Sequence, residues 1–339
     1  MKKILISLGL ISLVLFLIFM KNPHTQQEEA LAAMYDNVII KNAENAVAQC
    51  TRWQQTLNET SLGQRQPNLD NAFSHLVLAW KAVEATYIAG DLDQMAIDYP
   101  RYLDIFHTGN ESITQQMQKV IKSNSKAQYA LYKHSYKTIN ALEAILYMED
   151  QLTERKLALA KEISHNICER LSDINHVYQT KRSEFLSNRN NALSMLVNVL
   201  ANQTLVLKDW RIGDVAGLTK KYLSQPDAKR SEYYLSHLSL AAIKTILNTQ
   251  KQLIEKQTYP NFVEIAEIYS AQKQLEKVQQ DLIQAENEIT KLEKEPLHFS
   301  QQPQINTLYQ IISRLQSGYY NNLIHALPVT TKILEADGD

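Results

Sequence analysis

The sequence predicts an all-α protein made of two packed helical bundles. The chain has 339 residues, which is enough for two domains of ordinary size. Glycine and proline each occur only 8 times, whereas average usage would give about 24 and about 17 in a chain of this length. Apolar residues recur at helical spacing almost continuously after residue 25, with short breaks. About four helices in each half therefore indicate two bundles.

The balance of charge argues against a nucleic-acid partner. The chain carries 35 basic and 36 acidic residues, for a formal net charge of -1. No overall positive field is available to attract a polyanion. We therefore expect no binding to DNA or RNA.

Residues 1–22 are predicted to be an export signal or a membrane anchor. Lys2 and Lys3 precede an uncharged run from Ile4 to Met20, as in signal sequences and anchors. The run is at the short end of what spans a bilayer, and no small-residue cleavage site follows it closely, which favours an uncleaved anchor. We expect a periplasmic or cell-envelope protein, tethered to the inner membrane or secreted through this segment.

The chain contains two cysteines, Cys50 and Cys168. They can pair in an oxidising compartment, but the sequence does not show whether their Cα atoms approach each other. A disulfide therefore stays open at this point, and two cysteines do not favour a cysteine-based zinc site.

The first bundle is predicted over residues 23–190. Gly63 and Pro67 end its first helix, and Pro100 begins a short one. The remaining breaks in periodicity place helices over residues 25–58, 69–89, 112–123, 126–149 and 152–187.

The second bundle is predicted over residues 191–339, after the polar stretch SNRNN at 187–191. Its helices are expected over residues 192–210, 231–256, 262–295 and 305–326. One of these helices carries a heptad-like apolar seam, which favours packing inside the bundle over a dimer interface. The seam consists of Leu275, Val278, Leu282, Ala285, Ile289 and Leu292.

A polar stripe follows Pro100 if the helix there is long. Arg101, Asp104, His107 and Glu111 are spaced by three, three and four residues, and a histidine with two carboxylates suits iron, zinc or copper. The alternative is a helix break, because Thr108 and Glu111 also fit a capping box. In that case the stripe breaks, and Arg101 with Asp104 is a local ion pair.

Four stretches of the chain resemble the imelysin-like family, also known as insulin-cleaving peptidases or iron-regulated periplasmic proteins. In the last of them, Glu232, Ser236 and Ser239 stand where the family tends to carry a glutamate and two serines. The stretches are FSHLVLAWKAVEATYIAGD at 73–91, YPRYLDIFHTGNESI at 99–113, KTINALEAILY at 137–147 and RSEYYLSHLSLAAI at 230–243.

The G-x-H-x-x-E motif of that family falls on Thr138, Asn140 and Glu143, and only the glutamate is retained. An asparagine amide offers a weakly basic oxygen where a histidine offers a nitrogen lone pair, and it cannot act as a general base. This departure weakens a zinc-peptidase mechanism. His107 or His134 could supply a nitrogen from a neighbouring helix, but no spacing establishes it.

The resemblance implies a binding component in iron or other metal handling, with a cleft between the bundles. Asn140 and Glu143 can equally be an interhelix hydrogen-bond pair that fixes the register of the bundle. The other functions left open are an imelysin-type metallopeptidase with an atypical motif and a non-catalytic protein that holds an envelope partner. The ion is unknown among iron, zinc and copper, and no catalytic residue is assigned. The expected ligand-binding residues are Asn140, Glu143, Arg101, Asp104, Glu232, Ser236 and Ser239, and the expected metal ligands are Glu143 and His107.

Overall fold

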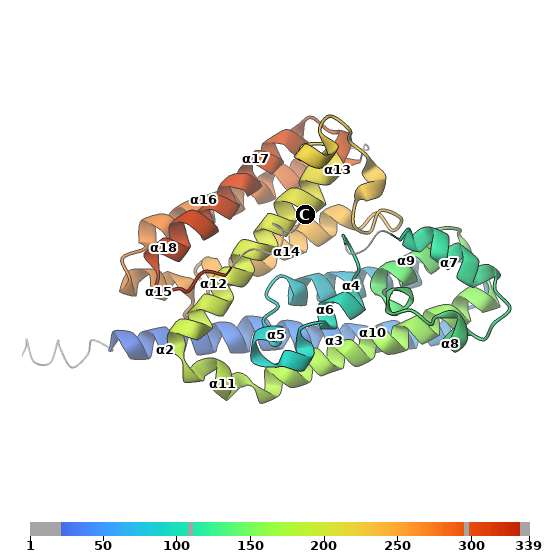
Figure 1. Ribbon diagram of the computed structural model, residues 1–339, viewed down its shortest axis with the longest axis horizontal. Coiled ribbons are helices and arrows are strands. Elements are labelled where there is room, and N and C mark those ends of the chain that lie inside the picture. Colours follow the sequence, from blue (N-terminus) through green and yellow to red (C-terminus); the bar gives the residue numbers. More distant parts are fainter. Residues whose placement is uncertain (1–21, 108–110, 295–297, 333–339) are drawn as a thin grey trace, which may run out of the picture.

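The computed structural model describes residues 22–107, 111–294 and 298–332, and these form two helical bundles packed against each other (Figure 1). The only strands in these ranges are β1, Gly63–Gln64, and β2, Gln151–Leu152, which pair antiparallel. The predicted all-α fold is thus confirmed. The apolar run at the N-terminus lies outside the described residues, and none of the described helices is long and apolar enough to cross a bilayer.

A long N-terminal helical segment contributes to both bundles. It consists of α2, Pro23–Met34, a π-helical turn, Tyr35–Ile40, and α3, Lys41–Glu59. The proline lies in the first turn, where its missing N–H is tolerated. α2 packs against α12, Arg189–Val206, and α15, Phe262–Ile268, of the second bundle. α3 packs against α4, Pro67–Glu84, and α10, Glu154–Thr180, of the first.

The first bundle is built on α3, α4, α9 and α10. The apolar residues of α4 recur at spacings of three and four from Phe73 to Val83, and this face is buried. Shorter helices and 3₁₀ turns connect these elements and cover one end. The helices of this half are α4, Pro67–Glu84, α5, Ala89–Leu92, α6, Tyr99–Leu103, α7, Ile113–Lys122, α8, Ala127–Ala130, α9, Ile139–Tyr147, α10, Glu154–Thr180, and α11, Arg182–Ser187; the 3₁₀ turns are Gln94–Ala96 and His134–Lys137.

The second bundle is built on α12, α14, α16 and α17. The heptad seam of α16 is buried against α14 and α17, so it is a packing edge inside the bundle. The helices are α12, Arg189–Val206, α13, Asp214–Ala216, α14, Ser239–Ile254, α15, Phe262–Ile268, α16, Gln272–Leu292, α17, Gln304–Ser317, and α18, Ile324–Ala326; π turns span Leu207–Gly213 and Gly318–Leu323, and 3₁₀ turns span Lys220–Tyr222, Ala228–Arg230 and Phe299–Gln301. The predicted boundary at 190/191 falls at the start of α12, and the division into domains stays a prediction.

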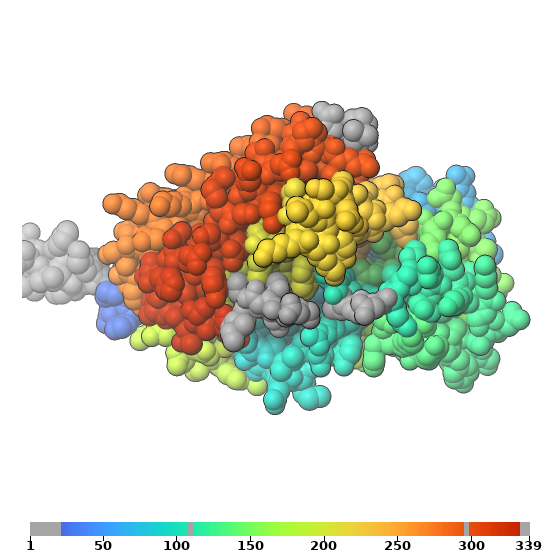
Figure 2. Space-filling model, turned by 45° about the horizontal axis from the view of Figure 1, so that its top comes forward, coloured from blue at the N-terminus to red at the C-terminus, as the bar shows by residue number. Residues whose placement is uncertain are grey.

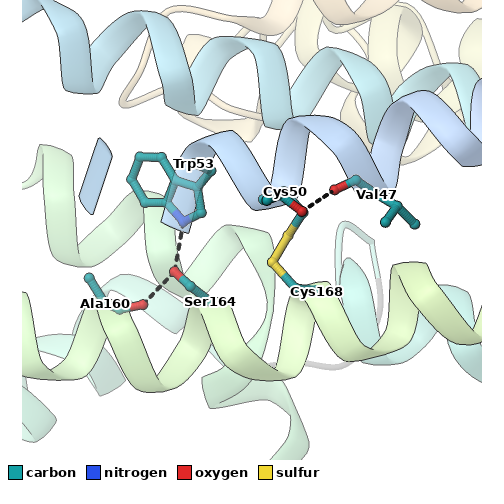
Figure 3. Close-up of a disulfide and its surroundings, with 7 residues drawn as sticks. Val47, Cys50, Trp53, Ala160, Ser164 and Cys168 are labelled. Atoms are coloured by element: carbon teal, nitrogen blue, oxygen red, sulfur yellow. Dashed lines mark hydrogen bonds between the residues drawn. A yellow bond between two sulfur atoms is a disulfide. The ribbon is translucent and has the colours of Figure 1, made fainter. Parts of the chain in front are cut away.

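A disulfide joins α3 to α10. Cys50 and Cys168 are bonded, with their Cα atoms 5.5 Å apart (Figure 3). Beside them, the buried indole of Trp53 on α3 donates a 2.7 Å hydrogen bond to Ser164 on α10. The pairing left open by the sequence is therefore present.

Several predicted helix boundaries were wrong. The helix predicted over 126–149 is divided into α8, a 3₁₀ turn and α9, because Thr138 adopts an extended conformation and caps α9 with its hydroxyl. The helix predicted over 231–256 begins only at Ser239, and the one over 262–295 is interrupted at Ser270, which has φ of 55°.

After Pro100 the structure has the helix break and not the polar stripe that a long helix would give. α6 ends at Leu103, and Asp104 is extended. His107 has φ of 62°, so no helix continues through it. The predicted cap at Thr108 lies outside the described residues.

Candidate functional site

A buried carboxyl group connects the two bundles. Glu143 on α9 accepts hydrogen bonds at Oε1 from the backbone N–H of Ser236 (2.9 Å) and from its hydroxyl (2.6 Å). Ser236 belongs to the loop that precedes α14. Within the described part of the chain, Glu143 Oε2 has no hydrogen-bonding partner, although the residue is only 6% exposed. The site therefore has one carboxylate oxygen available.

Asn140 lies one turn before Glu143 on the same helix. Its side-chain oxygen accepts a 2.7 Å hydrogen bond from the backbone N–H of Ile105. The amide thus holds the segment after α6 against α9, and its oxygen is already used.

Asp104 is the centre of a second group of contacts. One of its oxygens, Oδ2, accepts hydrogen bonds from Lys81 (2.7 Å), Trp80 (3.2 Å) and Tyr233 (2.7 Å). The other accepts from the backbone N–H of Phe106 (2.9 Å). Burial alone would raise the pKa of this carboxyl, but the Lys81 ammonium and these donors hold it well below its usual range.

Lys81 and Arg211 join three carboxylates from both bundles. The Lys81 ammonium contacts Asp104, Glu84 at 2.7 Å and Glu232 at 2.5 Å. The Arg211 guanidinium donates from Nε to Glu232 at 2.7 Å and from Nη2 to Glu84 at 2.9 Å. Lys81 is fully buried and Arg211 is 2% exposed. The cluster thus contains three carboxylates and two cations, so its net charge is one negative charge.

This excess charge acts on Glu143. Burial raises the pKa of the Glu143 carboxyl to about 7, the hydrogen bonds from Ser236 oppose the shift, and the charges of Asp104 and Glu232 add to it. The group therefore titrates near neutral pH, which is unusual for a glutamate.

The loop that carries Ser236 has an uncommon backbone. Tyr233 and His237 adopt φ values of 54° and 59°, a region that non-glycine residues seldom occupy. The Ser239 hydroxyl donates a 2.5 Å hydrogen bond to the carbonyl of Glu232 and so closes the loop at the start of α14.

His107 lies in a separate contact between the bundles. Its Nε2 is 3.0 Å from Asp214, and its ring stacks on Trp210 with centroids 4.6 Å apart. Burial lowers the pKa of His107, and Asp214 opposes this shift. The recorded partners of His107 are thus different from those of Glu143. Among the described residues, no three histidine, cysteine, aspartate or glutamate side chains are grouped so that they could hold a metal ion.

The structure brings most of the predicted site residues together but not all. Arg101 is 70% exposed at its side chain, 3.7 Å from Asp98, so the predicted pair with Asp104 was wrong. His134 is exposed and its ring lies 4.9 Å from that of Tyr102. The residues brought to the junction are Asp104, Asn140, Glu143, Glu232, Ser236 and Ser239.

Four members of the junction were not predicted: Lys81, Glu84, Arg211 and Tyr233. A usable signal existed for one of them. Lys81 lies directly after Trp80 in the apolar stripe of its helix, where an unpaired lysine is rare.

In the space-filling view the second bundle lies directly against the first (Figure 2). Two surface hollows lie elsewhere: one of about 340 Å³ between α16 and α17, and one of about 410 Å³ between α3 and α4. Neither is lined by Glu143 or Ser236, and a cleft at the junction stays a prediction.

Comparisons with known proteins agree with this architecture. The chain superimposes on an imelysin-like protein from Psychrobacter arcticum 273-4 with a TM-score of 0.76 and 16% identity, over 91% of this chain and 98% of that one. It also superimposes on a protein assigned as an iron-regulated protein A precursor from Parabacteroides distasonis ATCC 8503, with a TM-score of 0.70 and 12% identity, over 89% and 95%.

These identities are low enough that the superpositions establish the fold alone. No curated protein matches the sequence. The family model for imelysin, however, matches residues 33–316, which is most of the chain. The chain therefore belongs to the imelysin family.

Proposed function

We propose that this protein is a binding component in the handling of iron or another metal at the cell envelope, with its site at the Glu143–Ser236 junction. The observation that carries the proposal is the open Oε2 of Glu143. A carboxylate oxygen with no recorded hydrogen bond among the described residues, on a side chain that is only 6% exposed and lies beside an excess negative charge, favours a cationic ligand. Membership of the imelysin family and the likeness to an iron-regulated protein support the envelope setting.

The donor set fits a hard cation that keeps other ligands. Glu143 and the Ser236 hydroxyl offer oxygen, which suits hard metal ions. The oxygens of Asp104, Glu84 and Glu232 are already engaged by Lys81 and Arg211. The protein would therefore supply few of the ligands, and water or groups carried by the cargo would supply the rest.

This arrangement favours binding over the peptidase alternative. A catalytic zinc is usually held by three protein ligands rich in histidine. The motif position that would supply the nitrogen is Asn140, whose oxygen is bound to the backbone of Ile105. No catalytic residue is proposed.

The test is a titration of the purified full chain, prepared without chelator, with iron(II), zinc(II) and copper(II) salts separately. We expect near-stoichiometric binding of at least one ion, lost in Glu143→Ala. The matched control is Glu111→Ala, which removes an exposed carboxylate paired with Lys133. Failure of the wild-type chain to bind any of the three ions, or equal binding by Glu143→Ala, would refute the proposal.

A further inference from the structure

We infer that Lys81 and Arg211 are positioning residues, which assemble the binding site by holding Glu232 and so presenting Ser236 to Glu143. The link to a ligand rests on the proposed function. The positioning itself rests only on the geometry of the junction, and the two can be tested apart.

The loop at 232–238 needs external restraint. Tyr233 and His237 have left-handed backbone conformations, which are unfavourable in residues other than glycine. Such conformations persist only where the surroundings determine them. Ser236 lies between these two residues, so its position depends on what fixes the loop.

The restraints that precede Ser236 come mainly from the first bundle. Lys81 on α4 contacts the side chain of Glu232, and Asp104 accepts the hydroxyl hydrogen bond of Tyr233. Glu232 and Tyr233 precede Ser236 by four and three residues, and the Ser239 hydroxyl fixes the Glu232 carbonyl from the other side. The site thus forms only where the first bundle meets this loop.

Arg211 supplies the corresponding restraint from the second bundle. It belongs to the π turn Leu207–Gly213, and π turns within helices occur frequently at functional sites. Its guanidinium bridges Glu84 of the first bundle and Glu232 of the loop. Arg211 of the second bundle and Lys81 of the first therefore both bind the carboxylate of Glu232.

A different explanation is that the ion pairs of Lys81 and Arg211 only stabilise the packing of the two bundles. In that case, loss of Lys81 lowers stability but leaves Ser236 in place whenever the protein is folded. The amide proton of Ser236 distinguishes the two explanations, because it donates a 2.9 Å hydrogen bond to a carboxyl group and its chemical shift reports that bond.

The experiment is an NMR spectrum of the full chain labelled with [15N]serine, with the Ser236 resonance assigned by its absence in Ser236→Ala. We expect this resonance to move upfield or broaden in Lys81→Met. The matched control is Lys156→Met, which removes another buried lysine, one that is bound to the carbonyls of Glu149 and Gln151 in the first bundle. It should leave the Ser236 resonance unchanged.

Glu232→Gln serves as a second variant in case Lys81→Met does not fold. It keeps the shape of the side chain, removes its charge, and should shift the Ser236 resonance in the same direction. An unchanged resonance in every junction variant that folds overturns the inference.

The binding arm uses iron(II) alone. If the wild-type chain binds it, we expect affinity to fall about tenfold or more in Lys81→Met, the size usual for groups that orient a metal ligand. Lys156→Met should stay within about twofold of wild type, and equal losses in the two variants would count against positioning. If the wild-type chain binds none of iron(II), zinc(II) and copper(II), the proposed function fails, while the Ser236 resonance still decides whether Lys81 positions the loop.

Discussion

Glu143 and Ser236, which are 93 residues apart in the chain, share two hydrogen bonds that join α9 of one bundle to the loop before α14 of the other. The carboxyl group also has an oxygen left over. A pair that only fixed the register of two helices would not need that oxygen. The contact itself joins the two bundles, and the second oxygen is the one that the proposed ligand would use.

The stability of the protein should depend on pH through Glu143. Because the folded state raises the pKa of this carboxyl from 4.5 to about 7, the folded state binds the proton more tightly than the unfolded state. The contribution of Glu143 is therefore fully favourable below about pH 4.5 and is lost as pH rises towards 7. The loss amounts to roughly 3 kcal/mol at most.

Denaturant unfolding of wild type and Glu143→Gln at pH 5 and pH 8 measures this effect. We expect Glu143→Gln to gain stability relative to wild type on going from pH 5 to pH 8. Glu111→Gln, at an exposed position, should show no such change. Parallel pH profiles for wild type and Glu143→Gln would contradict the prediction.

Removal of Lys81 should be strongly destabilising. Lys81→Met leaves the buried carboxylates of Asp104 and Glu232 and the partly buried Glu84 with Arg211 as their only cation in the cluster, and breaking a buried ion network from one side costs about 3 to 5 kcal/mol. Arg182→Met breaks the half-exposed pair with Asp36 instead and should cost about 1 kcal/mol or less. Urea denaturation measures the free energy of unfolding of both variants. Equal losses would mean that the buried cluster contributes no more to stability than the half-exposed pair.

The disulfide should make a large contribution to stability. Cys50 and Cys168 are 118 residues apart, and the loop-entropy estimate for that length is roughly 5 kcal/mol, an upper bound in practice. We expect the double variant Cys50→Ser/Cys168→Ser to unfold at lower denaturant, and reductant to shift wild type but not the variant. A wild-type midpoint that reductant does not move would argue against the bond.

Restoring the family residue should strengthen metal binding. Asn140→His places an imidazole one turn from Glu143, and a nitrogen donor suits zinc(II) and iron(II). The change removes the hydrogen bond from the Ile105 amide to the Asn140 side chain, at a cost of about 1 kcal/mol in stability. Calorimetric titration should show tighter zinc(II) binding than wild type; weaker or equal binding would place position 140 outside the ligand shell.

Sequence reasoning found what is local along the helices. The spacing of Asn140 and Glu143 correctly placed both on α9, and the stripe of α4 was visible in its apolar residues. It did not find the partners of Asp104 and Glu232, because those are set by tertiary contacts between distant segments. Lys81 and Glu232 are 151 residues apart. From the sequence alone an arginine is expected at the surface, and only the fold shows that Arg211 is buried.

The extended residues were missed for a related reason. Periodicity continues through Asp104 and through 231–238; it predicts a helix for the second segment, and a helix or a helix break for the first. The contacts of Asp104 with Lys81 and of Glu232 with Arg211 override that local preference.

The contacts of the N-terminal helix also constrain the order in which the parts of the protein can fold. Gln27 on α2 accepts a hydrogen bond from Tyr269, 242 residues later in the chain. Contacts so distant in sequence slow folding, because the intervening chain must be ordered before they form. During synthesis, α3 can pair with α4 early, but α2 must wait for its partners α12 and α15, the second of which is made much later. Until then the face of α2 that packs against them is exposed and prone to aggregation, and it is the segment that a holding chaperone would be expected to cover.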